Sequence, residues 1–401
     1  MSNNVLKVSY LFVYFLVLYE FSVYISNDMI MPAMIHVTKD FNVDNSYIPS
    51  ALSLYIFGGS CFQLFVGYFA EKYGKRKLLL QGIAVFILGC IINSIALNIY
   101  QFLFARIIQG LGIAFISAIG YATVQESFPE KKAVKIIAFM TSVSILAPLI
   151  GPLLGSIHLQ FFHWRGINIF ITFLAAISFI GLYFSFPKDN KLNKNINFIE
   201  DGIKLYFKLI QQNKYIFGVL TFTFAQFPLI LWISVSPILL IQNAKMTFIE
   251  YGFSQFPIFG GFIAGTILLQ FLLKKFELHQ IIVISSFFIF SGLFLLFMTS
   301  FYGMSNVFFA ILFLSIYTIG LGCISSPLFR TILYSFEYPK TTMTALFSFI
   351  NMIILSISVE FFSKYIKNLT VFSYILVISL ICFIVTNLLF LTLIKERKKV
   401  V

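Results

Sequence analysis

Apolar stretches of about 20 residues recur along nearly the whole chain, separated by short polar segments. A helix of that length crosses a hydrocarbon core roughly 30 Å thick. The strands of a membrane barrel would alternate polar and apolar residues, and these stretches do not alternate. Of the 401 residues, 59% are hydrophobic and 11% are charged, whereas roughly a quarter of a soluble domain is charged. The sequence therefore predicts an all-α integral membrane protein.

We predict twelve transmembrane helices in two six-helix bundles. Their approximate bounds are residues 8–37, 46–69, 78–97, 99–124, 134–158, 166–187, 214–241, 249–273, 279–299, 305–329, 341–362 and 371–394. The first stretch is too long for the apolar part of a cleavable signal peptide, so we interpret it as a span. The longest hydrophilic segment separates six spans from six. It predicts an N-terminal bundle at 1–187, a cytoplasmic linker at 188–213 and a C-terminal bundle at 214–401.

The net charge of +13 is distributed unevenly between the two sides of the predicted membrane. If the segments between spans alternate in side, 22 of the 28 Lys and Arg residues fall on the side of the N-terminus and five on the other. Because basic residues accumulate in cytoplasmic loops, both termini are expected in the cytoplasm of a bacterial cell, with the chain in the inner membrane. The basic residues thus set topology, and no nucleic-acid partner is expected.

Two short patterns recur in matching spans of the two halves. YIFGGSCFQLFVG at 55–67 is echoed by PIFGGFIAGTILL at 257–269, and QGLGIAFIS at 109–117 is echoed by IGLGCISSP at 319–327. Together these echoes predict a duplicated six-helix unit. Two repeats of six spans are typical of secondary transporters, whose substrate site lies near the middle of the bilayer.

The first predicted span carries two carboxylic acids, Glu20 and Asp28. Tyr24 and Asn27 share their helical face, and the two acids lie about 12 Å apart along the axis, too far to share one proton. Acids within spans usually serve function, so we expect them to bind protons or a cationic substrate. The alternative is that they bond to backbone groups freed by a kink at Pro32.

Arg106 is the one cation placed well inside a predicted span, and Gln109, Gly110 and Ile113 follow it on the same face. We interpret it as a residue that tunes the two acids electrostatically or that gates the transport pathway. The alternative is that its long side chain extends to the membrane surface, because it lies about seven residues from the start of its span.

The residue patterns of other functions are missing from the sequence. No CxxC pair is present, and the cysteines, expected to pack in the core, are Cys61, Cys90, Cys323 and Cys382. The histidines lie scattered at span ends, at His36, His158, His163 and His279. The phosphate-binding pattern GxxxxGK[ST] is also absent, which argues against transport driven by ATP. We therefore expect no metal, no cofactor and no enzymatic activity.

Three motifs resemble those of the major facilitator superfamily. GYFAEKYGKRK at 67–77 is similar to the signature GxLaDrxGrRk, with Glu71 where Asp is usual. RIIQG at 106–110 lies in the fourth span. APLIGPLLG at 147–155 resembles the motif associated with antiporters. The resemblance implies the major facilitator fold.

A narrower resemblance links the chain to the multidrug facilitator class of bacterial drug/proton antiporters. It extends over essentially the full chain and is carried by APLIGPLLG together with LYEFSVYISNDMIMP at 18–32, GYATVQESF at 120–128 and QFPIFGGFIAG at 255–265. It implies a monomer that exports lipophilic cationic and neutral compounds, chloramphenicol-like drugs among them, in exchange for protons by alternating access. Glu20, Asp28 and Arg106 match the family's proton-linked acids and its membrane arginine.

The same resemblance implies a substrate cavity with soft, apolar walls, which suits promiscuous binding. The residues expected to line it are Tyr24, Asn27, Asp28, Ile113, Tyr121, Met140, Ser144, Leu229, Ile230, Trp232, Ile233 and Met352. Each of them alternatively belongs to an ordinary core or to a lipid-facing surface.

Two further groups of residues are predicted to control motion. A cytoplasmic gate is expected where Glu71 pairs with Arg76; its members are Gly67, Glu71, Gly74, Arg76, Glu126 and Arg330. The alternative is a solvated turn. Close approach and bending of the fifth span are expected from Pro148, Gly151, Pro152 and Gly155. An alternative to drug export is the export of one metabolite, or of Na+ or K+, in exchange for protons.

Overall fold

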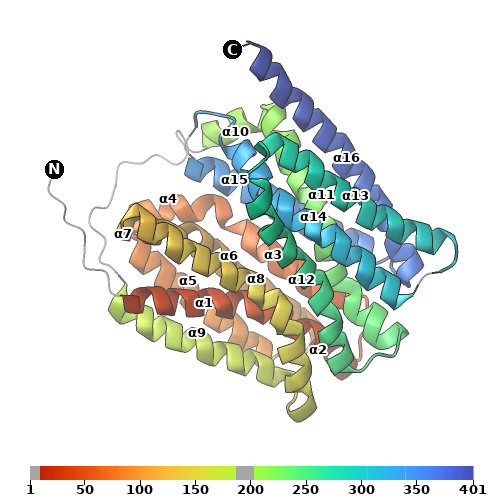
Figure 1. The fold of residues 1–401 in the computed structure, drawn as a ribbon. Coiled ribbons are helices and arrows are strands. Elements are labelled where there is room, and N and C mark those ends of the chain that lie inside the picture. Colours follow the sequence, from red (N-terminus) through yellow and green to blue (C-terminus); the bar gives the residue numbers. More distant parts are fainter. Residues whose placement is uncertain (1–9, 187–202, 305, 339, 401) are drawn as a thin grey trace. The chain divides into compact units, whose positions relative to one another are not determined.

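The computed structural model describes residues 10–186, 203–304, 306–338 and 340–400 (Figure 1). These residues are almost entirely helical and include no strand. The chain divides into two compact units, unit 1 at Met1–Asp201 and unit 2 at Gly202–Val401. Most of the predicted linker, 188–213, lies outside the described residues, and the bounds predicted for the two bundles remain predictions.

Unit 1 contains nine α-helices and one π-helical segment in its described part. They are α1 (Tyr10–Asp28), α2 (Ile30–Asp40), α3 (Tyr47–Cys61), α4 (Gln63–Tyr73), α5 (Lys75–Ser94), α6 (Ile99–Phe115), η1 (Ile116–Gly120), α7 (Tyr121–Ser127), α8 (Glu130–Phe161) and α9 (Arg165–Ser185). The π-helical segment η1 joins α6 to α7 without a loop, so these three elements form one continuous span.

In its described part, unit 2 has a short helix within the predicted linker, followed by six longer α-helices and one π-helical segment. They are α10 (Lys204–Ile210), α11 (Asn213–Ser236), the π-helical η3 (Pro237–Asn243), α12 (Phe248–Leu272), α13 (Leu278–Phe301), α14 (Val307–Leu333), α15 (Lys340–Ser363) and α16 (Leu369–Val400). Here η3 extends α11 into a single span.

Eleven helical segments of the described chain are long and apolar enough to cross a membrane. The predicted first span, 8–37, is not among them; its helix α1 carries the polar residues Glu20, Asn27 and Asp28, and Met29 separates α1 from α2. Pro32 explains the interruption: it has no N–H for the carbonyl of Asp28, and its ring would clash with that carbonyl in an unbroken helix. The all-helical membrane fold is confirmed, while the count of twelve spans remains a prediction.

The same pairs of spans pack together in both units. In unit 1, α3 and α5 pack on α6, and α1 packs on α8 and α9. In unit 2, the corresponding α12 and α13 pack on α14, and α11 packs on α15 and α16. The fourth span even begins alike in the two units, with an asparagine whose side chain caps the helix: Asn98 accepts from the backbone N of Gln101, and Asn306 from that of Phe309, each at 2.9 Å. This agrees with the duplication that the sequence echoes predict.

The surface of the helices carries many large apolar side chains, as a chain surrounded by lipid requires. Phe104, Phe173 and Phe287 are 58%, 62% and 69% exposed, and a water-soluble protein rarely shows such a continuous apolar surface. Cys61 is also exposed, so the expectation that all four cysteines pack in the core is wrong for this one. It ends α3 at the junction with α4, where a small apolar thiol faces lipid as readily as core.

Candidate functional site

Glu20 lies in the middle of α1 with its side chain fully buried. Its Oε1 atom accepts hydrogen bonds from the hydroxyls of Tyr121 on α7, at 2.7 Å, and Ser144 on α8, at 2.8 Å. Its Oε2 atom is buried as well and has no hydrogen-bond partner within the described part of the chain. The structure thus brings together three residues predicted for the site and leaves one carboxylate oxygen free to accept a proton or a cation.

The π-helical segment η1 helps to place Tyr121. A π-helical turn holds more residues than an α-helical turn, so it shifts the register of every residue that follows it. Here the shift falls between Arg106 on α6 and Tyr121, the first residue of α7. Wide turns of this kind often occur at functional sites, and this one directs a hydroxyl toward Glu20.

Asp28, the second acid, ends α1 and is 6% exposed. The amide nitrogen of Asn27 donates to its Oδ1 atom at 3.4 Å. Among the described residues, no lysine or arginine lies within ion-pair distance of Asp28 or of Glu20. Both acids are therefore buried carboxyl groups without a directly bonded cation, a state that is costly in a membrane and marks a functional site.

The predicted antiporter motif packs directly against the interruption in the first span. A Cβ atom on Gly151 would lie 2.5 Å from the Cβ of Asp28, and one on Gly155 would lie 2.2 Å from the carbonyl oxygen of Met29. Both glycines belong to α8, which also contains Pro148 and Pro152. Only glycine lets α8 approach this closely, so the motif covers the acid with backbone rather than with side chains.

Arg106 is fully buried in α6 and donates four hydrogen bonds. Its Nε donates to the carbonyl of Ala51 at 3.0 Å, and one terminal nitrogen donates to the carbonyl of Ser26 at 3.4 Å and to Oε1 of Gln109 at 2.9 Å. The other terminal nitrogen donates to Oδ1 of Asn27 at 2.6 Å. The alternative in which the side chain extends to the membrane surface is therefore wrong.

Asn27 connects the buried cation to the second acid. Its carbonyl oxygen accepts from Arg106, and its amide nitrogen donates to Asp28, so Arg106 acts on the carboxyl through one intervening amide. The guanidinium carbon also lies 4.5 Å from the ring centre of Tyr55, whose hydroxyl donates to the carbonyl of Val23 at 2.6 Å. Tyr55 was not predicted for the site, because an aromatic residue in an apolar span carries no distinguishing signal.

A polar cluster around Gln109, a partner of Arg106, was likewise not predicted from the sequence. The amide nitrogen of Gln109 donates to Oδ1 of Asn168 at 3.0 Å and to the sulfur of Cys90 at 3.2 Å, and its oxygen accepts from Asn93 at 3.1 Å. Asn93 and Asn168 are both buried, on α5 and α9. Two asparagines inside apolar spans are a signal that could have been used, because buried amides need partners.

At the predicted gate, Lys75 forms an ion pair with Glu126. Arg76, predicted to pair with Glu71, donates to the carbonyl oxygen of Tyr183 and lies 5.6 Å from the centre of its ring. The side chain of Glu71 lies outside the described structure. These two contacts join the start of α5 to the end of α7 and to the end of α9.

The other described members of the predicted gate belong to different elements. Gly74 has φ of 98°, a backbone conformation that favours glycine, and it separates α4 from α5. Gly67 faces open space. Arg330 lies in unit 2, near the end of α14, with its guanidinium carbon 4.7 Å from the ring centre of Tyr334.

The remaining predicted cavity residues of unit 1 differ in exposure. Tyr24 is half-buried one turn after Glu20, whereas Ile113 on α6 is 8% exposed and Met140 on α8 is fully buried. Ile113 approaches the backbone of Gly59 on α3. Of these three, Tyr24 has the most exposed side chain.

In unit 2, the predicted cavity residues lie on α11 and α15. Leu229, Ile230 and Ile233 on α11 and Met352 on α15 are half-buried. Trp232 is fully buried, and its indole N–H donates to Oε1 of Gln255 at 2.9 Å. That tryptophan therefore anchors α11 to α12 within the unit.

Comparisons with known proteins agree with this picture. The family model described as Major Facilitator Superfamily matches residues 16–359. The chain is 34% identical over 346 residues to a protein named Multidrug transporter MdfA of Escherichia coli O6:H1, covering 86% of this chain and 84% of that one. It is also 34% identical over 350 residues, with the same coverage, to Multidrug resistance protein MdtM of Escherichia coli K12. The solved structure of the xylose transporter XylE from E. coli shares the fold, with a TM-score of 0.71 at 15% identity over 94% of this chain and 96% of that one.

Proposed function

The chain belongs to the Major Facilitator Superfamily, and on that premise we propose that it exports lipophilic drugs, cationic and neutral, in exchange for protons by alternating access. One observation carries this proposal: Glu20 and Asp28 are buried in α1 without a bonded cation, and Glu20 keeps one oxygen without a hydrogen-bond partner in the described structure. The relatives named as multidrug transporters support the choice of substrate class.

In the proposed mechanism, protons and cationic drugs compete for the same carboxyl groups. Tyr121 and Ser144 fix one oxygen of Glu20 and thereby orient the other toward an incoming proton or cation. Binding of a cationic drug favours the ionised carboxyl and releases its proton, and reprotonation on the other side of the membrane displaces the drug. Competition of this kind couples the two fluxes without any covalent step.

Arg106 is proposed to set the strength with which Asp28 holds its proton. Its charge reaches Asp28 through Asn27, so a movement of α6 relative to α1 would lengthen this connection and change the affinity for the proton. Neutral drugs cannot compete by charge. For them, apolar contacts with the residues predicted to line the cavity supply the binding energy.

The proposed topology places both termini in the cytoplasm of a bacterium and the chain in its inner membrane, as the charge asymmetry indicates. Residues 1–187 and 214–401 act as the two moving bundles, and the chain works as a monomer. The contacts of Lys75 with Glu126 and of Arg76 with Tyr183 lie at the cytoplasmic ends of their helices in this topology. They belong to the proposed gate, together with Glu71 and Arg330.

The substrate class is tested by expressing the protein in an efflux-deficient bacterial host. We expect resistance to rise at least several-fold for chloramphenicol and for the lipophilic cation tetraphenylphosphonium, and to vanish when the proton gradient is collapsed. If neither drug is affected while growth at alkaline pH with high Na+ or K+ improves, the chain is a cation/proton antiporter instead. Resistance to neither drug nor alkali would point to a single metabolite.

Proton coupling is tested by proton release from purified protein. Adding tetraphenylphosphonium to detergent-solubilised protein in weak buffer should acidify the solution, and at least one of Glu20→Gln and Asp28→Asn should abolish the signal. Glu360→Gln is the matched control, because this acid lies at the end of α15 and pairs with Lys364 at 3.5 Å. Unchanged release from both acid variants would refute the assignment.

A further inference from the structure

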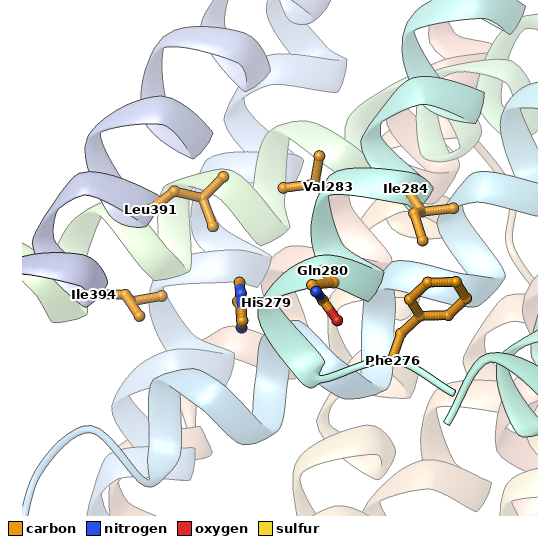
Figure 2. A pocket seen from close by; sticks show the side chains of 7 residues that line it. All are labelled: Phe276, His279, Gln280, Val283, Ile284, Leu391 and Ile394. Carbon is orange, nitrogen blue, oxygen red and sulfur yellow. The ribbon is translucent and has the colours of Figure 1, made fainter. Parts of the chain in front are cut away.

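Unit 2 contains a pocket of about 350 Å³ that the export mechanism does not use. It lies between the start of α13 and the last turns of α16, far along the chain from the residues on α11 and α15 described above (Figure 2). Its lining consists of Phe276, His279, Gln280, Val283, Ile284, Leu391 and Ile394. We call it the α13–α16 pocket.

The walls of the α13–α16 pocket continue into surfaces that face the membrane. Val283 is 53% exposed, and Phe287, one turn further along α13, is 69% exposed. On α16, Leu388 is 59% exposed one turn before Leu391. Because these apolar faces belong to membrane-spanning helices, acyl chains of the bilayer surround them, and the groove between them offers one such chain a deeper contact.

The opposite end of the pocket is polar. His279 and Gln280 belong to the first turn of α13, as Figure 2 shows beside Ile394 of α16. The side-chain oxygen of Gln280 accepts from the backbone N of Glu277 at 3.0 Å, which leaves its amide nitrogen for another acceptor. Nδ1 of His279 lies 3.2 Å from Oε2 of Glu277, which leaves its Nε2. The amide nitrogen of Gln280 is a donor of the kind that binds phosphate oxygens.

Positive charge lies at the polar end of the pocket. Lys274 and Lys275 precede the pocket in the turn before α13, and both are exposed. Glu277 offsets only part of this charge. An apolar groove that ends beside two cations complements an anionic amphiphile better than a neutral one.

We propose that the α13–α16 pocket binds an anionic phospholipid of the surrounding bilayer. One acyl chain lies against Val283 and Leu391, and the phosphate lies beside His279 and Gln280 within reach of Lys274 and Lys275. The lipid holds the start of α13 to the end of α16 within unit 2. Export of drugs neither requires nor excludes this site, so the two proposals stand or fall separately.

The test is lipid binding to the purified, delipidated full-length protein in detergent, followed by native mass spectrometry and thermal unfolding. We expect phosphatidylglycerol to remain bound and to raise Tm, and phosphatidylcholine with the same acyl chains to bind about tenfold or more weakly, since each lysine near an anionic headgroup contributes on the order of a fivefold preference. Equal binding of the two lipids would overturn the proposal.

Two pairs of variants locate the site. Val283→Trp fills the pocket and should remove the retained phosphatidylglycerol, whereas Phe287→Trp, one turn away on the same exposed face, should retain it. Lys274→Ala/Lys275→Ala should weaken binding about tenfold or more. Lys364→Ala/Lys367→Ala removes the same charge between the end of α15 and the start of α16, away from the pocket, and should leave binding unchanged. Retention by Val283→Trp, or equal loss in both lysine pairs, would place the lipid elsewhere.

Discussion

The second and fourth spans pack almost identically in the two units, yet the two contacts carry different chemistry. In unit 1, a Cβ atom on Gly110 of α6 would lie 1.9 Å from the carbonyl oxygen of Tyr55 on α3. In unit 2, a Cβ atom on Gly322 of α14 would lie 2.2 Å from the carbonyl oxygen of Phe262 on α12. A glycine of the repeated pattern therefore serves this close approach of backbones in each unit, although the pattern matches Gly110 with Gly320 and Gly112 with Gly322.

The charges differ where the packing does not. Within the described chain, the buried charged side chains are Glu20, Asp28 and Arg106, and all three belong to unit 1. When the two fourth spans are matched through their glycine pattern, Ile316 stands where Arg106 does, and Ile319 where Gln109 does. Duplication supplied two similar scaffolds, and one of them holds the buried ionisable groups. The comparison distinguishes the glycines that hold the fold together from the buried ionisable residues that are proposed to couple transport to protons.

The largest effect is expected from the shared glycines. Gly110→Val and Gly322→Val should each reduce the yield of monodisperse protein about tenfold or more, because the added side chain meets rigid backbone rather than a movable side chain. Size-exclusion chromatography of detergent-solubilised protein measures the yield. Gly260→Val is the control, since Gly260 faces open space. A large loss for one glycine and none for the other would mean that the two contacts are not equivalent.

The next effect is expected from Arg106. Arg106→Leu removes four hydrogen bonds and takes away the donor to the buried Oδ1 of Asn27. A buried unpaired acceptor costs roughly 1–3 kcal/mol and each lost bond about 1 kcal/mol, so Tm should fall by roughly 5–10 °C. Drug resistance should be lost. Thermal unfolding and a resistance assay measure the two effects. Ile316→Leu, at the matching position of unit 2, should change neither quantity, and a comparable loss there would remove the distinction between the units.

A smaller effect is expected from Tyr317, a buried neutral residue of unit 2. The hydroxyl of Tyr317 donates to the carbonyl of Ala225 at 2.6 Å and accepts from the backbone N of Leu229 at 3.3 Å. Tyr317→Phe removes both bonds, which should cost about 1 kcal/mol and lower Tm by roughly 2–4 °C. Resistance and substrate-induced proton release should remain. Loss of proton release in this variant would extend coupling into unit 2.

The smallest effect is expected at the end of α2. Burial opposes ionisation of Asp40, but bonds from Trp164 at 2.7 Å and His163 at 2.9 Å outweigh it and hold the pKa of Asp40 below its ordinary value. A lowered pKa stabilises the fold at neutral pH, and this contribution is lost as the pH falls through the lowered value. Asp40→Asn should therefore lower Tm by roughly 1–2 °C at pH 7, and the difference from the unaltered protein should shrink as the pH falls below the ordinary pKa of an aspartate. If Asp40→Asn lost more Tm as the pH fell, relative to the unaltered protein, the direction of the argument would be wrong.

Much of the fold was predictable, because a span of lipid thickness leaves a long apolar signature. The break at Met29 was indicated by Pro32, which removes a helical hydrogen bond. The π-helical segment η1 was not predictable, since no residue type marks a wide turn. The neighbourhood of Glu20 was partly predictable: Tyr121 and Ser144 were expected near the cavity, but their convergence on one oxygen depends on the register that η1 sets.

The partners of Arg106 could be predicted only in part. Two of them are the carbonyl oxygens of Ala51 and Ser26, and since every residue has a carbonyl the sequence gives no sign of which ones bind. The ion pair of Lys75 with Glu126 was obscured for a different reason. Three basic residues follow one another at 75–77, and their order does not say which one meets the acid.

The wide turn at Ile116–Gly120 ties the identity of one hydrogen bond to the length of the chain. If the same residues formed an ordinary helix, every later position in the span would rotate by about 100° relative to α6. Tyr121 would then point away from α1, although no side chain had been exchanged. Deletion of one residue from this segment would offset that rotation, so the wide turn and its extra residue together keep the hydroxyl of Tyr121 on Glu20.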